Sequence, residues 1–75
     1  MRLSDGKIGG IYEIMDMGNT GRAARRLEAL GMGGRAVVRV LNKKAGGDMI
    51  IWVRGTRWAI GRRIAEEIPV QEARR

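Results

Sequence analysis

Apolar and polar residues alternate along much of this chain, and glycine-rich turns interrupt the pattern. From Arg35 to Lys43 the alternation predicts a strand whose two faces differ in character. One face carries Ala36, Val38 and Val40. The opposite face carries Val37, Arg39 and Leu41. The first face is therefore expected to lie in the core and the second to lie outside.

Similar patterns predict four more short strands, over about residues 8–17, 49–54, 56–60 and 67–71. In the first of these we expect Ile11 and Ile14 to be buried, and their odd spacing predicts a bulge or a strong twist. The third strand should bury Ile51 and Val53 and turn Trp52 outward beside Ile50. The fourth should place Trp58 and Ile60 in the core.

One short helix is predicted between the first two strands, over about residues 21–30. Ala23, Leu27 and Leu30 recur at the spacing of one helix face. Asn19 or Thr20 can cap its start, and Gly31 suits its end. A single helical turn is expected at about residues 61–65. Five short strands are too few for a sandwich, so the pattern predicts a small, partly open barrel whose last strand pairs with the first.

The 75 residues allow one domain, predicted over residues 1–71 with a frayed tail at 72–75. Cysteine and histidine are absent, which excludes disulfides and removes the commonest metal ligand and general base. No apolar run approaches the length of a membrane span. We therefore expect a cytoplasmic protein without membrane insertion.

The formal net charge of +7 favours acidic partners. Two groups of arginines are candidates for partner binding, because a guanidinium pairs carboxylate or phosphate in bidentate fashion. The first group, on the predicted helix, is Arg22, Arg25 and Arg26. The second, near the fourth strand, is Arg54, Arg57 and Arg62, with Arg63 beside them. Trp52 is a further candidate, in an exposed apolar patch with Val37 and Leu41.

Metal, nucleotide and catalytic sites are not expected. Glu66 and Glu67 are neighbours whose side chains point apart on a strand, and with Glu72 and Asp48 they offer only a weak oxygen site. The glycine-rich segment 31–36 follows a helix and opens a strand, the reverse of a dinucleotide-binding turn. No acid–base pair or activated nucleophile is recognisable. We predict no metal, no cofactor and no enzymatic activity.

Several segments together resemble the ferrous iron transport protein A (FeoA) family. The segments are 27–34, Val38 with Val40, the turn 42–47, 51–55 and, most closely, 59–70. The resemblance runs from about Leu3 to Val70. Two turns depart from the family pattern: the loop 32–34 is one residue short, and Asp48 replaces a frequent proline.

The resemblance implies a mainly β fold, an SH3-like five-stranded barrel with one short α-helix inserted after the first strand. It implies an accessory role in ferrous iron uptake, by binding and regulating the membrane permease of the FeoB type, whose cytoplasmic part is a GTP-hydrolysing G domain. We expect the arginines of the predicted helix to meet that G domain. The same barrel is similar to a domain of metal-responsive repressors of the diphtheria toxin repressor type. An arginine acting in GTP hydrolysis is conceivable, but no residue is singled out for it.

Three alternatives remain open at this stage. The high charge also fits a small nucleic-acid-binding barrel, although only Tyr12 and Trp52 are available for base stacking. A metal-regulator-type SH3-like domain is the second alternative. The third concerns the Trp52 face, which can equally serve self-association into a homodimer.

Overall fold

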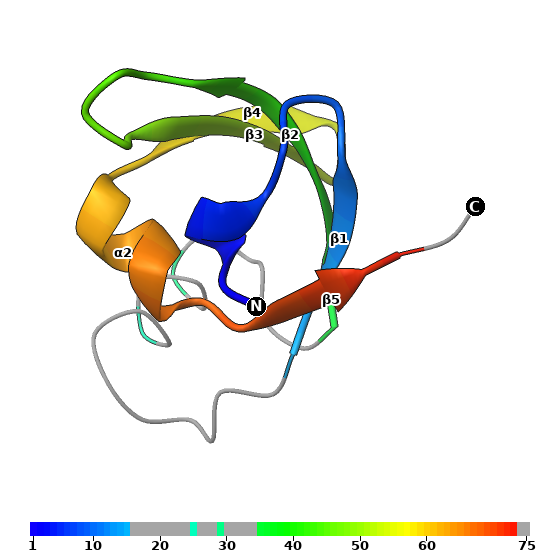
Figure 1. Ribbon diagram of the computed structural model, residues 1–75. Helices are drawn as coiled ribbons and strands as arrows, with labels where there is room; N and C mark the ends of the chain where they lie inside the picture. Colours follow the sequence, from blue (N-terminus) through cyan, green and yellow to red (C-terminus); the bar gives the residue numbers. More distant parts are fainter. Residues whose placement is uncertain (16–24, 26–28, 30–34, 74–75) are drawn as a thin grey trace.

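The computed structural model describes residues 1–15, 25, 29 and 35–73. Within these residues the fold is mainly β, with strands joined in a single antiparallel sheet (Figure 1). The strands are β1 (Ile11–Ile14), β2 (Val37–Lys43), β3 (Met49–Val53), β4 (Thr56–Ile60) and β5 (Val70–Glu72). A 3-10 helix, η1 (Leu3–Asp5), precedes the sheet, and α2 (Arg62–Glu67) connects β4 to β5. The predicted five-stranded, mainly β architecture is confirmed.

The sheet has the strand order β4-β3-β2-β1-β5, so the last strand pairs with the first as predicted. It curls from β4 and β3 through β1 to β5, and α2 and η1 lie on its inner side (Figure 1). β4 and β5 remain the two ends of this order, which makes the barrel partly open. The chain start lies beside the approach to β5, because Leu3 N–H donates to the Ile68 carbonyl (2.8 Å) and Val70 N–H to the Met1 carbonyl (2.9 Å).

The core is aliphatic apart from one tyrosine, and no described buried side chain is charged or strongly polar. Its residues are Leu3, Tyr12, Ile14, Ala36, Val38, Val40, Met49, Ile51, Val53, Ile60, Ala65, Ile68 and Val70. The predicted inner faces of β2 and β3 are confirmed, as is the outward position of Trp52. Trp58, predicted as core, is half-buried and packs against the core from its edge.

The prediction for β1 was wrong at one position, since Tyr12 is buried there and Ile11 is only half-buried. Two glycines explain the burial of this ring. A Cβ added at Gly10 would lie 2.5 Å from the Tyr12 hydroxyl, and one at Gly6 would lie 2.9 Å from the ring. The hydroxyl accepts a hydrogen bond from Lys7 N–H (2.9 Å), which satisfies the polar end of the side chain.

Of the two alternatives predicted for β1, a bulge or a strong twist, the bulge is not present over Ile11–Ile14. The burial of Tyr12 and Ile14 restores strict alternation in that strand, and the sheet instead changes register within β2. Val40 lies opposite Ile51 and Asn42 lies opposite Ile50, so Leu41 is the extra residue. The irregularity therefore belongs to the β2–β3 ladder.

The C-terminal elements begin and end later than predicted. α2 covers six residues where a single turn was expected. β5 starts at Val70 and includes Glu72, and Ala73 N–H still donates to the Ile11 carbonyl (3.0 Å). Of the helix predicted over 21–30, only Arg25 and Ala29 are described, both helical and exposed, and the remaining positions lie outside the described residues.

Candidate functional site

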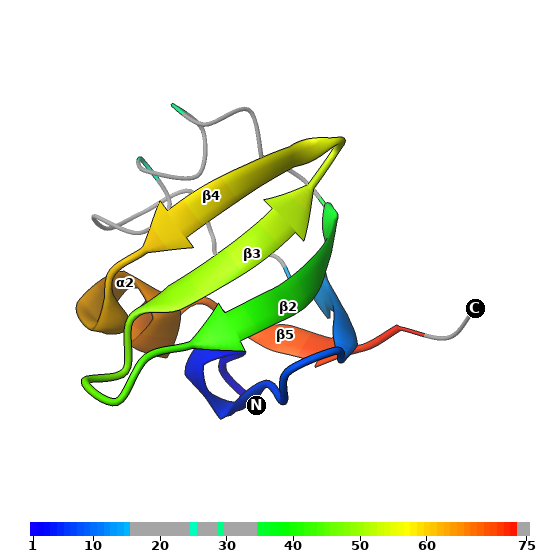
Figure 2. The same cartoon turned by 90° about the horizontal axis from the view of Figure 1, so that it is seen from above.

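A row of three large side chains crosses the outer face of β2, β3 and β4. Trp52 lies directly opposite Arg39 on β2 and Arg57 on β4. Residues directly opposite in antiparallel strands share a face, with Cβ atoms about 5 Å apart. All three side chains are exposed, Trp52 with 44% of its surface accessible. Figure 2 looks onto this outer face, on the side of the sheet away from α2 and η1.

An open groove of about 450 Å³ lies beside this row. Its lining residues are Ile11, Val37, Val38, Arg39, Leu41 and Trp52. Ile11 belongs to the same row, because it lies opposite Arg39 on β1. The bulge at Leu41 changes the register at one end of the groove. The outer face thus joins an aliphatic hollow to an exposed indole and guanidinium groups.

The carboxylates that are described lie away from this row or are already paired. Glu13 accepts a hydrogen bond from Gln71 Nε2 (2.6 Å) and lies 3.7 Å from the Arg35 guanidinium. Arg62 and Glu66 form an ion pair at 3.8 Å on α2. By contrast, neither Arg39 nor Arg57 forms an ion pair with any described residue.

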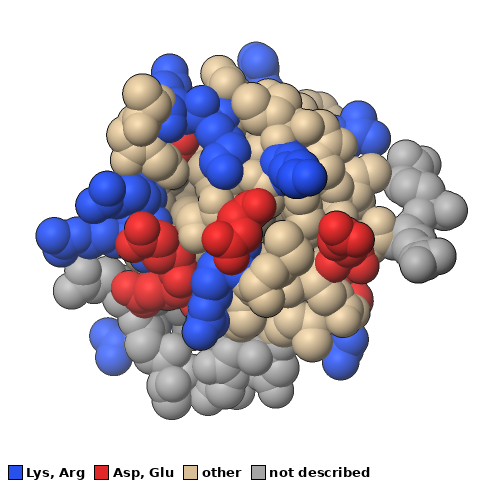
Figure 3. Space-filling view, viewed as in Figure 1, with Lys and Arg blue, Asp and Glu red and all other residues tan. Residues whose placement is uncertain are grey.

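The side of the molecule with α2, η1 and β5 has a different electrostatic character. Figure 3 shows basic and acidic side chains interspersed across it. Mixed charges of this kind give little net field toward an anion. The outer face of β2–β4 is consequently the better candidate for binding an acidic group.

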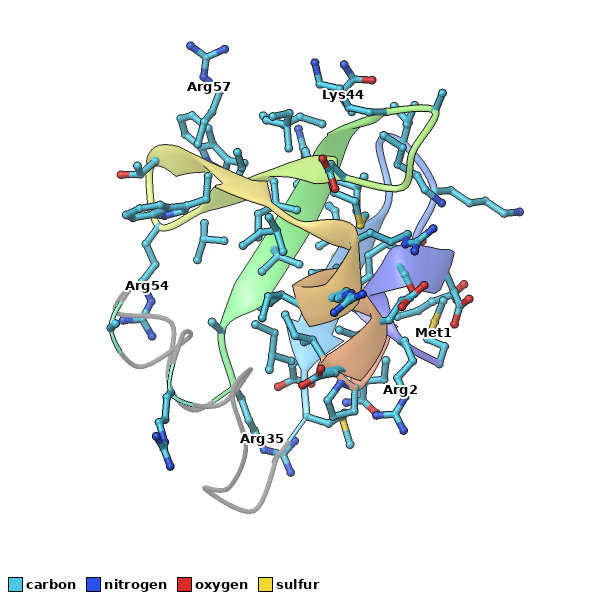
Figure 4. The ribbon with its side chains drawn as sticks, turned by 90° about the vertical axis from the view of Figure 1, so that its left-hand side faces the viewer. Met1, Arg2, Arg35, Lys44, Arg54 and Arg57 are labelled. Carbon is cyan, nitrogen blue, oxygen red and sulfur yellow. The ribbon has the colours of Figure 1, made fainter. Side chains whose placement is uncertain are left out.

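The second predicted arginine group does not form one cluster. In Figure 4, Arg57 points outward from the sheet, whereas Arg54 points toward the opposite side. Arg54 occupies the β3–β4 turn and Arg62 opens α2, so the length of β4 separates them. Of this group, the structure brings only Arg57 together with Trp52. Arg25 is exposed, and Arg22 and Arg26 lie outside the described residues.

Arg62 has a structural function that the sequence pattern did not reveal. Its backbone N–H donates to the Asp48 Oδ1 atom (2.9 Å), so the β2–β3 turn caps the start of α2. Its aliphatic stem packs on Gly47, where an added Cβ would lie 2.5 Å from Arg62 Cδ. Asp48 thus joins the turn to the helix.

Arg39 was not among the predicted site residues. Alternation placed it correctly on the outer face, but sequence alone gives no strand register, which is what sets it opposite Trp52. Ile11 was missed for a different reason. It was predicted to lie in the core, whereas the structure places it half-buried on the outer face. One signal in the sequence could have identified Arg39: it lies between Val37 and Leu41 on the outer face of its strand, where the other side chains are apolar.

Candidate metal ligands are not gathered together among the described residues. None of them forms a group of three or more histidine, cysteine, aspartate or glutamate side chains able to hold a metal ion. No described helix is long and apolar enough to cross a membrane.

Comparison with known proteins identifies relatives along nearly the whole chain. The FeoA domain family matches residues 1–72. No curated protein matches the sequence. Among solved structures, an iron uptake regulatory protein (FeoA) is 27% identical with a TM-score of 0.84, covering 97% of each chain.

Two further FeoA structures match at similar levels. The protein from Chlorobium tepidum is 31% identical with a TM-score of 0.80, covering 96% of this chain and 70% of its own. A zinc complex of Stenotrophomonas maltophilia FeoA is 26% identical with a TM-score of 0.73, covering 95% and 89%. The latter is described as a prokaryotic SH3 domain protein. The predicted SH3-like barrel is therefore confirmed.

Proposed function

This chain belongs to the FeoA domain family, and we propose that it is a non-enzymatic, cytoplasmic accessory protein of ferrous iron uptake. In this proposal it binds the cytoplasmic G domain of the membrane ferrous iron permease and regulates it. The family match over residues 1–72 is the single observation that carries the proposal. S. maltophilia FeoA, a relative with the same barrel, has been put forward as a ferrous iron transport activating factor.

The outer face of β2–β4 supports a role in binding rather than catalysis. It combines an exposed tryptophan, two arginines and an apolar groove, and tryptophan and arginine are enriched where binding energy concentrates at protein interfaces. The described residues contain no metal-binding cluster that would suggest iron carriage. Among the predicted site residues, Trp52 and Arg57 are the ones that share this face.

Binding of the complete chain to the purified G domain tests the proposal. We expect saturable binding by biolayer interferometry, and a changed rate of GTP hydrolysis when the chain is added. Absence of binding under low and physiological salt would reject the permease as partner. Binding with an unchanged hydrolysis rate would reject regulation of the nucleotide reaction while leaving the association.

Two double variants compare the predicted binding surfaces. Arg22→Glu with Arg26→Glu reverses charge on the predicted helix, and Arg39→Glu with Arg57→Glu makes the same charge change on the sheet. We expect the sheet variant to lose G-domain binding. Loss confined to the helix variant would move the interface to the segment predicted as helix.

A further inference from the structure

We propose that the outer face of β2–β4 recognises a short acidic protein segment that also carries an apolar anchor residue. The anchor occupies the groove beside Trp52, and carboxylates of the segment pair with Arg39 and Arg57. The inference deepens the proposed function, on which it rests for the source of the segment, the cytoplasmic part of the permease.

The spacing of the row defines what the segment must present. Neighbouring strands lie about 4.8 Å apart, which puts the backbones at Arg39 and Arg57 about 10 Å apart with Trp52 between them. Each guanidinium offers a planar set of donors that pairs a carboxylate in bidentate fashion. The two guanidiniums therefore suit two separate carboxylates with an apolar group between or beside them.

The lining of the groove indicates that the ligand carries an apolar side chain as well as negative charge. Three aliphatic side chains, Ile11, Val37 and Leu41, line it together with the indole. Val37 and Trp52 are 53% and 44% exposed, which leaves a continuous apolar surface in water next to the arginines. Covering that surface with an apolar side chain releases water and also strengthens the adjacent ion pairs by desolvation.

Charge argues against a second copy of this chain as the occupant. In a two-fold symmetric dimer the same patch lies on both sides of the interface. Arg39 and Arg57 of one copy would then face the same two arginines of the other copy, and like charges placed together are costly. An acidic segment removes this repulsion.

The aromatic inventory argues against a nucleic acid. Platforms for single strands stack successive bases on several exposed aromatic side chains. Tyr12 is 4% exposed and Trp58 packs against the core, which leaves Trp52 as the sole exposed ring among the described residues. One ring with a largely aliphatic hollow suits a peptide side chain better than a run of bases.

Selection from a display library of random peptides tests the chemistry without assuming the permease. We expect the full-length chain to enrich peptides that combine Asp or Glu with Leu, Ile or Phe. A selected peptide should shift the amide signals of Ile11, Val37 and Arg39 and the indole signal of Trp52 in a ¹⁵N-labelled sample. Enrichment of neutral or basic peptides, or shifts confined to other surfaces, would overturn the inference.

Matched variants provide the second arm of the test. Arg39→Glu with Arg57→Glu should weaken binding of the selected peptide about tenfold or more. Lys7→Glu with Arg63→Glu makes the same charge change at exposed positions off the row and should weaken it much less. If both double variants weaken binding equally, the effect comes from the net charge of the protein, and a specific site is rejected.

Three further outcomes discriminate the alternatives. Tighter binding of a single-stranded oligonucleotide than of any selected peptide, with steep salt dependence, would favour a nucleic-acid surface and overturn the inference. A dimer in analytical ultracentrifugation that Trp52→Ala abolishes would assign the face to self-association instead. If acidic peptides occupy the groove but the G domain does not bind, the recognition chemistry stands and the permease assignment fails.

Discussion

The inner and outer faces of β2 and β3 differ sharply in burial. On the inner face Val38, Val40 and Ile51 are almost completely buried. On the outer face, one residue along each strand, Arg39 and Trp52 are exposed. Because side chains alternate along a strand, adjacent residues serve unrelated purposes. In the proposal made above, stability and recognition are therefore assigned to alternate positions along each strand, so we expect them to respond to different substitutions.

A cavity on the inner face should give the largest difference in stability between substitutions on the two faces. Ile51→Ala should lower the free energy of unfolding by about 2–5 kcal/mol, because it removes packed methyl groups that the neighbours cannot replace. Ile50→Ala, next in sequence on the half-buried outer side, should cost clearly less. Urea unfolding followed by circular dichroism measures both. Equal losses would show that the two faces do not differ in packing, and Ile51→Val can replace a variant that fails to fold.

An added methyl group next to β1 tests the same difference between crowded and open positions. Gly10→Ala should destabilise the protein by about 1–3 kcal/mol, because the new methyl group meets the buried Tyr12 ring. Gly46→Ala is the matched control, since an added Cβ there meets nothing within 4 Å. Thermal unfolding of the two variants should separate them. Similar melting temperatures would mean that the Tyr12 ring does not need this glycine.

The cap between the β2–β3 turn and α2 is a smaller, local effect. Asp48→Ala should cost about 0.5–2 kcal/mol, because the Arg62 N–H loses its side-chain acceptor. Asp48→Asn keeps a carbonyl oxygen in place and should retain most of the stability. Hydrogen exchange at the Arg62 amide provides a direct readout. Unchanged protection of that amide in Asp48→Ala would contradict the assigned cap.

The β3–β4 turn gives an effect of the opposite sign. Arg54 has a φ of 50° and Gly55 a φ of 85°, the positive pair of a two-residue hairpin turn that favours Asn-Gly or Gly-Gly. Arg54→Gly should therefore raise the free energy of unfolding by about 0.5–1 kcal/mol. Arg54→Ala removes the same charge without relieving the backbone and should give little change. A comparable gain from both variants would trace the effect to charge.

The sequence predicts the strands correctly where the local alternation of apolar and polar residues alone determines which side chains are buried. Alternation gave β2, β3 and β4 with their faces, because each strand carries a clear period of two. It failed at β1, where Tyr12 is buried and where Gly6 and Gly10, which lie outside the strand, leave room for its ring. It also missed η1, whose Leu3 is buried through contacts with a segment more than sixty residues away.

Some residues of the candidate site could be predicted from the sequence, but which of them lie side by side could not. Trp52 and Arg57 were identified as exposed, and the structure places them side by side. Their partnership with Arg39 depends on strand register, which arises from pairing between distant segments. The same limitation made Arg54, Arg57 and Arg62 look like one cluster, although the turn and the length of β4 separate them.

The most direct test of the separation between the two faces measures affinity and stability on one variant. Arg39→Glu with Arg57→Glu alters only exposed side chains, so the free energy of unfolding should change by about 0.5 kcal/mol or less per substitution. Calorimetric titration of the same preparation with the permease G domain should show affinity reduced about tenfold or more. Unchanged affinity in a normally stable variant, or loss of stability in parallel with binding, would contradict the account.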